Sequence, residues 1–455
     1  MNYYKCILLL IIIAISSYSA ENDSSRFKLS GWGYFTLGQV ISSPFEDKVA
    51  AAVIDYNFDN QWLVDFDAGL KCVALFGKNG KARVHAGFTT GYLLQLQISQ
   101  NGENLRRKFA PYLIDAAIEN AFTRGKNTFF GEFGYFPVKY NPQAMNLGEY
   151  LFRSGTYPQN INSGFELADK EKLCGLHGSV KHIINENLHL KADLYFTSGM
   201  RDYPPHDFSL AYILSAHSKI FQFSAGIDHA HLISLNEHLT TPATDPYFKP
   251  GSIFGDNVRI YDTVSLTETD TIIDTINPTF RGTKGMARFT FDPKVLFNTS
   301  IFGDEDLKLY CEAAFLGFKN YPVWWEKPLE RMPIMVGLNL PAFKLLDVLS
   351  VELEYYKSPY INTAENAWRY RSPLPFTGLS GQSKIEDVVP QHDDDIKWSV
   401  YASKKIGRFR LSAQVASDHI LKTPYVPGPP TSSKYTEICP RTKDWYWMLR
   451  AMFYL

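Results

Sequence analysis

Charged side chains alternate with apolar ones in several segments, and rows of this kind can hold ions and polar solutes against a wet surface. The segment 63–88 shows the pattern most clearly, because apolar residues stand at every second position from Val64 to Cys72 and from Ala82 to Phe88. A period of two is typical of a β-strand with one polar and one apolar face. The polar face of this predicted hairpin carries Asp65, Asp67, Lys71, Arg83 and His85.

The two predicted strands of this hairpin are joined by Lys78-Asn79-Gly80-Lys81. Asn-Gly tolerates the positive φ angles of a two-residue hairpin turn, so we place the turn at this pair. The apolar face extends over about nine or ten residues per strand, close to the length that crosses hydrocarbon as a tilted strand. An amphipathic hairpin in a soluble sandwich is the alternative for this segment taken by itself.

Other predicted strands also carry charges on their polar faces, and these residues are candidates to line the same wet surface. They are Glu132, Lys191, Asp193, Arg288, Glu312, Glu352, Glu354, Arg410 and Arg450. Fixed charges of both signs set a transverse field across a water-filled passage and determine its ion preference. Salt bridges between strands that only stabilise the wall are the alternative, and the two roles are compatible.

The chain start and the composition indicate an exported membrane protein. Residues 1–19 hold Lys5, an apolar core from Ile7 to Ile15 and a small-residue end, which predicts a secretory signal peptide cleaved after Ser19. No later run of eighteen apolar residues exists, so a mature chain that enters a membrane does so as a closed barrel. Aromatic residues make up 15% of the chain, which is typical of barrel girdles. The net charge of −1 argues against a nucleic-acid partner.

Strand-like segments repeat along residues 20–455, and connections of alternating length join them. Short turns fall near 78–81, 124–127, 185–187, 217–219, 341–344 and 405–407. Long connections fall at 99–110, 139–172, 199–207, 230–284, 318–330, 358–394 and 419–440. Short turns on one edge and long loops on the other are typical of outer-membrane barrels. We therefore predict one all-β domain, an antiparallel up-and-down transmembrane barrel of about sixteen strands, with eighteen as the alternative because 293–305 is long for its edge.

The final segment 441–455 alternates apolar and polar residues and ends in Phe453-Tyr454-Leu455. Together with the signal peptide and the sixteen strands, it gives the chain a resemblance to bacterial outer-membrane porins, which usually end in Phe. The resemblance implies location in the outer membrane of a Gram-negative bacterium, among its lipids and lipopolysaccharide. It also implies insertion by the outer-membrane assembly machinery, a homotrimer, and passive passage of small hydrophilic solutes or ions.

The long connection 139–172 follows the sixth predicted strand and is the third on its edge. In porins the third external loop folds into the lumen and narrows it, so by resemblance of position we expect this segment to do the same. Glu149 and Arg153 would then lie near the constriction. They stand four residues apart in a helix-compatible run, so an intrahelical ion pair is the alternative.

Motifs for catalysis are missing from the sequence, which has no nucleophile elbow, no zinc-binding His-Glu-x-x-His and no phosphate loop. We therefore expect no enzymatic activity, no catalytic residue, no bound metal and no cofactor. A surface binding, adhesion or structural protein is the alternative function, because the loops 230–284 and 358–394 are long and rich in aromatic residues. A hydrophobic-substrate transporter is the third hypothesis, disfavoured because no hatch precedes Phe27.

Overall fold

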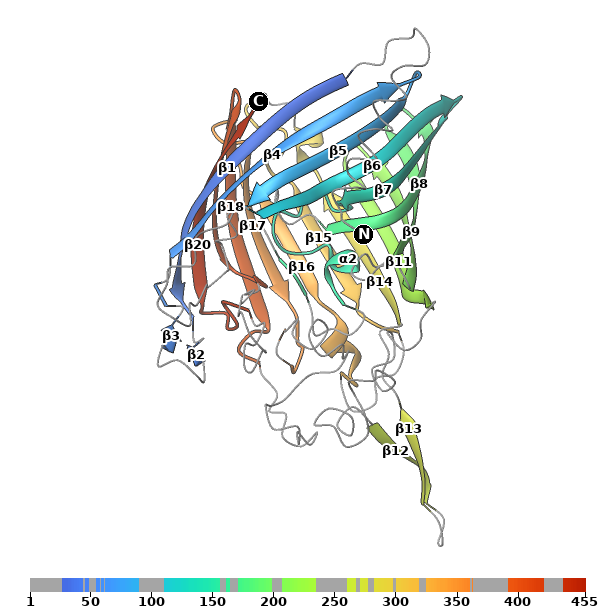
Figure 1. Ribbon diagram of the computed structural model, residues 1–455, viewed down its shortest axis with the longest axis vertical. Coiled ribbons are helices and arrows are strands. Elements are labelled where there is room, and N and C mark those ends of the chain that lie inside the picture. Colours follow the sequence, from blue (N-terminus) through green and yellow to red (C-terminus); the bar gives the residue numbers. More distant parts are fainter. Residues whose placement is uncertain are drawn as a thin grey trace.

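Sixteen strands form a closed antiparallel ring in the computed structural model of this chain (Figure 1). The structure describes residues 27–43, 46–48, 55–57, 59–60, 62–89, 110–155, 161–163, 171–198, 207–234, 260–266, 271–276, 282–297, 300–318, 325–360, 362, 392–420 and 437–455. The barrel strands are β1 (Phe27–Ser42), β4 (Trp62–Phe76), β5 (Gly80–Thr89), β6 (Ala110–Arg124), β7 (Asn127–Val138), β8 (Glu171–Asn185), β9 (Leu188–Ser198), β10 (Asp207–Ser218), β11 (Phe221–Ser234), β14 (Gly282–Phe291), β15 (Leu309–Phe315), β16 (Ile334–Asn339), β17 (Val348–Tyr355), β18 (Ile396–Ile406), β19 (Phe409–Ser417) and β20 (Trp445–Tyr454).

The ring closes where the first barrel strand pairs with the last. β1 pairs with β4 on one side and with β20 on the other, with Thr36 opposite Asp65 and opposite Arg450. The predicted sixteen-stranded up-and-down barrel is therefore confirmed. The predicted signal peptide, residues 1–19, lies outside the described residues.

Smaller elements lie outside the ring of strands. Two short hairpins stand at the same end of the barrel (Figure 1); they are β2 (Glu46–Lys48) with β3 (Asp55–Asn57) and β12 (Ile260–Leu266) with β13 (Thr271–Ile276). The described part of the 292–308 connection begins with a 3-10 turn, η4 (Pro293–Leu296), and contains no strand. The eighteen-strand alternative is wrong, because the closed ring contains sixteen strands and β14 pairs directly with β15.

The first hairpin turn differs from its prediction. Phe76 pairs directly with Gly80, so the turn has three residues, 77–79, and Gly80 begins β5. The positive φ that a tight turn needs is supplied by Gly77, at 56°, and not by Asn79. Gly80 is instead required for space, because a Cβ there would lie 2.3 Å from the Phe76 ring.

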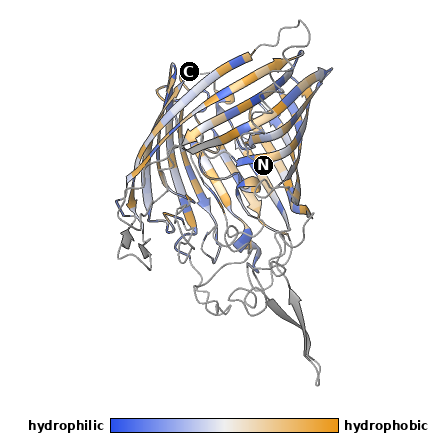
Figure 2. Ribbon diagram, viewed as in Figure 1, coloured by the Kyte–Doolittle hydropathy of each residue, from blue (hydrophilic) through white to orange (hydrophobic). Residues whose placement is uncertain are grey.

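The strands present apolar side chains outward and polar side chains inward. On β9, Leu190 and Leu194 are 43% and 51% exposed on the outer surface, whereas Asp193 is 6% exposed. Hydrophobic and hydrophilic residues alternate along the strands (Figure 2). An apolar outer surface around a closed polar ring is the arrangement of a transmembrane barrel. Among the residues that the structure describes, no helix is long and apolar enough to cross a membrane.

Candidate functional site

Residues 139–155, which we call the inner segment, follow β7 and pack inside the barrel (Figure 1). The predicted position after the sixth strand is wrong by one, because β7 is the fifth strand of the barrel. Their short helix α2 (Tyr150–Arg153) contacts β11, β14 and β15. Leu147, Tyr150 and Leu151 are fully buried among inward-facing side chains of the strands. The inner segment therefore covers one side of the interior, which we call the covered wall. Its buried charged residues include Lys284, Glu312, Glu352, Glu354, Lys397 and Asp418.

Glu312 on β15 binds the inner segment with both carboxylate oxygens. Its Oε1 accepts hydrogen bonds from the Tyr140 hydroxyl at 2.6 Å and the Tyr150 N–H at 2.9 Å. Its Oε2 accepts from the Asn141 side-chain amide at 2.8 Å and the Glu149 N–H at 3.0 Å. A carboxylate has about four acceptor positions, so Glu312 is fully occupied by neutral donors of the segment.

Glu352 on β17 holds the preceding part of the inner segment in the same way. Its Oε1 accepts from the Met145 N–H at 2.5 Å and the Tyr310 hydroxyl at 2.9 Å. Its Oε2 accepts from the N–H groups of Asn146 and Leu147, both at 2.9 Å. Hydrogen bonds to a charged acceptor are stronger than neutral ones, so these two carboxylates fix the path of the segment along the wall.

Gly148 gives the inner segment the sharp turn between its two anchor points. Its φ is +87°, and a Cβ at this position would lie 2.7 Å from the Met335 Cε and 3.3 Å from the Glu312 Oε2. Glu149 follows in the left-handed region with a φ of 59°. Only glycine satisfies both the positive φ and the close approach to the wall.

Glu149 and Arg153, the two residues expected near a constriction, lie in the inner segment but are only 3% and 6% exposed. They form the i,i+4 ion pair that the sequence also allowed, with Arg153 Nη2 and Glu149 Oε2 separated by 3.7 Å. The Glu149 Oε1 accepts from the Asn141 N–H, and Arg153 donates to the Asn146 carbonyl at 2.8 Å. Burial raises the pKa of the Glu149 carboxyl, although the nearby Arg153 charge opposes this shift. Both side chains therefore shape the segment and present little charge to water.

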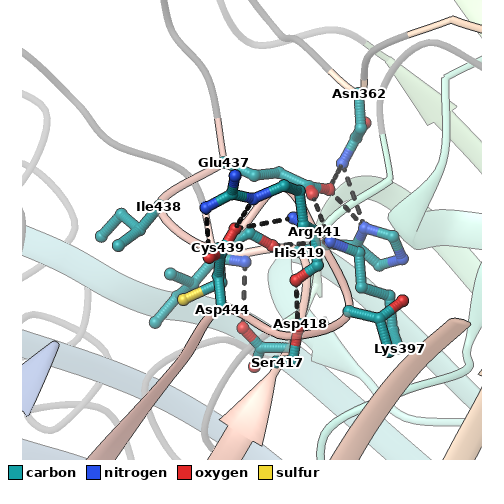
Figure 3. Close-up of polar contacts among 12 residues, drawn as sticks. Asn362, Lys397, Ser417, Asp418, His419, Glu437, Ile438, Cys439, Arg441 and Asp444 are labelled. Atoms are coloured by element: carbon teal, nitrogen blue, oxygen red, sulfur yellow. Dashed lines mark hydrogen bonds and ion pairs between the residues drawn. The ribbon is translucent and has the colours of Figure 1, made fainter. Parts of the chain in front are cut away.

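A buried cluster around His419 joins the inner segment to the connection between β19 and β20. We call it the histidine cluster; its residues are Tyr150, Glu354, Lys397, His419 and Glu437, and Figure 3 labels Lys397, His419 and Glu437. His419 Nε2 bonds to the Glu354 carboxylate at 2.5 Å, and its Nδ1 bonds to the Glu437 carboxylate. The other oxygen of Glu437 accepts from Lys397 Nζ at 2.8 Å. The Tyr150 hydroxyl of the inner segment donates to Glu354 at 2.6 Å.

The charges of this cluster hold one another in the ionised form. Burial lowers the pKa of His419, but the carboxylates of Glu354 and Glu437 outweigh it and raise that pKa to about 10. Burial favours the protonated form of Glu437, but the charges of Lys397 and His419 lower its pKa to about 2. An imidazolium with both N–H groups bound to carboxylates follows from these shifts.

The opposite side of the interior is built on Arg83 of β5. Its Nε donates to Asp115 at 2.9 Å, and its two terminal nitrogens bond to Glu119 and Glu132. His85 lies 3.3 Å from the other oxygen of Asp115. One arginine therefore ties three neighbouring strands together through three carboxylates.

The same row of charges continues across β8 and β9. His177 bonds to Asp193 at 2.9 Å and lies 3.5 Å from Glu132, while Lys191 contacts Asp193 at 2.8 Å. The side chains of Lys191 and Arg83 are 37% and 12% exposed, so this side is in contact with solvent inside the barrel. We call it the charged wall. Its members are Arg83, His85, Asp115, Glu119, Glu132, His177, Lys191 and Asp193.

Five further lining candidates lie on β4, β19 and β20; they are Asp65, Asp67, Lys71, Arg410 and Arg450. The Tyr34 hydroxyl donates to Asp67 at 2.5 Å, and the Arg450 guanidinium lies over the Tyr34 ring at 4.3 Å. Arg450 Nε also donates to the Thr36 hydroxyl at 3.0 Å. Asp65 is buried, and Lys71 and Arg410 are half-buried on the inner face. The contacts of Asp67 and Arg450 are hydrogen bonds and a cation–π contact within the inner wall, and the lining role of these residues stays a prediction.

Sequence reasoning singled out the inner segment but missed several of its contacts. Tyr140, Asn141 and Tyr150 bind wall carboxylates, and His419 and Glu437 form the histidine cluster. A buried acid at an alternating strand position gives no signal of the loop that covers it. The inner-segment residues and the wall carboxylates that bind them lie more than 160 positions apart along the chain, as for the Tyr150 N–H and Glu312.

Among the described residues, no group of three or more His, Cys, Asp and Glu side chains has an arrangement that could hold a metal ion. The four described cysteines, Cys72, Cys174, Cys311 and Cys439, are free thiols. The aromatic loops behind the alternative function, 230–284 and 358–394, lie largely outside the described residues.

Comparison with known proteins gives similarity of fold. No family model and no curated protein sequence matches the chain. A solved structure of Salmonella typhi OmpF in complex with daunomycin shares 9% identity, with a TM-score of 0.46, over 96% of this chain and 99% of that one. A mutant of Rhodopseudomonas blastica porin shares 8% identity, with a TM-score of 0.41, over 94% of this chain and 100% of that one. Both of these solved structures are bacterial porins.

Proposed function

We propose that this chain is an outer-membrane channel for passive passage of small hydrophilic solutes or ions. The observation that carries the proposal is the charged wall, where inward-facing charges of both signs keep contact with solvent inside a closed barrel. The outer surface of the same strands is apolar, so the charges serve the interior and not the exterior. Fixed charges in a lumen attract counter-ions and set ion preference.

In this proposal the inner segment narrows the passage by occupying the covered wall. Solutes then move along the charged wall, past Arg83, His85 and Lys191. Glu149 and Arg153 act by fixing the shape of the segment. We expect no enzymatic activity, because passive passage of solutes requires no catalytic residue.

The proposal includes export of the chain and its insertion into the outer membrane. We expect export by the signal peptide 1–19, insertion by the outer-membrane assembly machinery, and an annulus of lipids and lipopolysaccharide. A homotrimer is expected from the resemblance to porins. The apolar outer face supports membrane insertion, because a closed barrel leaves no unpaired strand edge in hydrocarbon.

The test is the single-channel conductance of the refolded mature protein in a planar bilayer. We expect stable open steps on the nanosiemens scale, and different steps in Glu149→Ala and Arg153→Ala because the inner segment shifts. Arg408→Gln is the matched control, since Arg408 lies exposed in the turn between β18 and β19. Folded protein that never conducts would refute the channel and favour a surface binding role for the long loops.

A further inference from the structure

A row of four polar residues crosses the inner face of β9, β10, β11 and β14. Lys191 stands opposite Ser215, Ser215 opposite Ser224, and Ser224 opposite Arg288. Directly opposite residues have Cβ atoms about 4.5–5.5 Å apart, so the four side chains form one continuous strip. We call it the basic row.

Arg288 is the unusual member of the basic row, because it is 3% exposed and its Nε and Nη1 have no hydrogen-bond partner among the described residues. Its natural counter-ion is Glu312, directly opposite on β15. All four acceptor positions of that carboxylate are taken by the inner segment, so none is left for Arg288. A buried guanidinium with unmatched donors is costly unless an acceptor reaches it.

The two serines extend the set of donors beside Arg288. The Ser224 hydroxyl donates to the Ser215 Oγ at 2.8 Å, and both side chains are buried. A hydroxyl has one proton to donate, so Ser215 receives this bond and keeps its own proton for another acceptor. The row therefore offers donors from a guanidinium and from at least one hydroxyl.

Lys191 forms the solvent end of the basic row. Its side chain is 37% exposed and contacts Asp193 at 2.8 Å. Three strand spacings separate Lys191 from Arg288, about 14 Å between backbones. At this distance Lys191 does not share a small ligand with Arg288, but its charge draws anions toward the row.

We propose that the basic row binds a small tetrahedral oxyanion of the phosphate class, held by Arg288 and Ser215. The planar guanidinium fork matches two oxygens of such an anion, which a spherical halide does not offer. Burial strengthens the contact, since the guanidinium is shielded from bulk water. The use of the site to select solutes rests on the proposed channel, whereas its affinity for an oxyanion does not.

The test is titration of the folded, detergent-solubilised full chain with inorganic phosphate, followed by ³¹P NMR line broadening. We expect saturable binding that a large excess of chloride does not displace. Arg288→Gln should bind about tenfold weaker or worse, because charge-assisted hydrogen bonds are lost. Arg408→Gln, at an exposed turn, should bind as the wild type does. Equal affinity in Arg288→Gln and wild type, or displacement by chloride, would overturn the inference.

Two milder variants cover the case in which Arg288→Gln does not fold. Arg288→Lys keeps the charge but loses the fork, and Ser215→Ala loses the hydroxyl, so both should weaken phosphate binding. Unchanged affinity in both also overturns the inference. Conductance in chloride, measured on the same samples, separates the two proposals. Protein that binds phosphate without conducting refutes only the channel, and protein that conducts without binding refutes only the site.

Discussion

Replacing Glu352 by Gln should loosen the inner segment without disturbing the barrel. The Glu352 carboxylate is 1% exposed and accepts the N–H groups of Met145, Asn146 and Leu147 together with the Tyr310 hydroxyl. The strand itself keeps its ladder hydrogen bonds to both neighbours in the variant. The perturbation therefore acts on the contact between segment and wall.

The size of the effect follows from which donors lose their acceptor. If the new amide nitrogen replaces Oε1, the Tyr310 hydroxyl can turn and accept, but the Met145 N–H is left unpaired. If it replaces Oε2, both Asn146 and Leu147 lose their acceptor, so the first orientation is preferred. One buried unpaired N–H costs about 1–3 kcal/mol, and the other bonds lose their charge assistance. We expect about 3 kcal/mol, hence about a hundredfold larger population of the released segment.

Hydrogen exchange followed by mass spectrometry measures this population directly. Amides of a peptide covering 145–147 should exchange about a hundredfold faster in Glu352→Gln, because exchange reports the free energy of local opening. Glu119→Gln is the matched control, since its carboxylate binds Lys81 and Arg83 on the charged wall and does not touch the segment. Equal exchange of this peptide in wild type and Glu352→Gln would refute the anchoring role.

Three further predictions concern the segment, the histidine cluster and the charged wall. Gly148→Ala should destabilise the inner segment by about 1–3 kcal/mol, because the φ of residue 148 is +87° and the added Cβ would contact the wall. Hydrogen exchange of the amides 145–147 measures this effect. Gly131→Ala is the control, since the space around its added Cβ is open, and it should leave that exchange unchanged. The charged His419 should contribute up to about 5 kcal/mol to the free energy of unfolding, fully present below pH 6.5 and lost as the pH rises toward 10. The depressed pKa of Glu437 gives the opposite sign, with stabilisation present above about pH 4.5 and lost as the pH falls toward 2. Denaturant unfolding at several pH values tests both signs, and His419→Gln should abolish the alkaline loss. Arg83→Gln should make the channel more cation-selective, seen as a shifted reversal potential in a salt gradient; an unchanged potential would argue against solute passage along the charged wall.

The strands and their faces were predictable from the sequence alone. An alternation such as Leu190, Lys191, Ala192, Asp193 and Leu194 places each side chain on one of two faces, whatever the neighbouring strand contributes. Connection lengths then fixed the strand number, because a closed up-and-down barrel sorts its turns and loops by edge. The first hairpin turn was not predicted correctly, because either Gly77 or Gly80 could supply its positive φ. The strand register, in which Phe76 pairs with Gly80, decides that Gly77 supplies it.

The two sides of the interior were decided by the tertiary structure. Glu132 and Glu352 both stand on polar faces of predicted strands, yet one lies in the charged wall and the other is sealed under the inner segment. The difference arises because residues 139–155 pack against the wall that carries Glu352. Contacts such as the Met145 N–H with Glu352, 207 positions away, determine this packing. Local periodicity reports which face a residue occupies, but burial of that face depends on chain segments that closure of the barrel brings together. The Nε and Nη1 of Arg288 lack a hydrogen-bond partner for the same reason. Glu312 lies opposite Arg288 on β15, but it accepts its hydrogen bonds from the inner segment, which belongs to the other half of the chain.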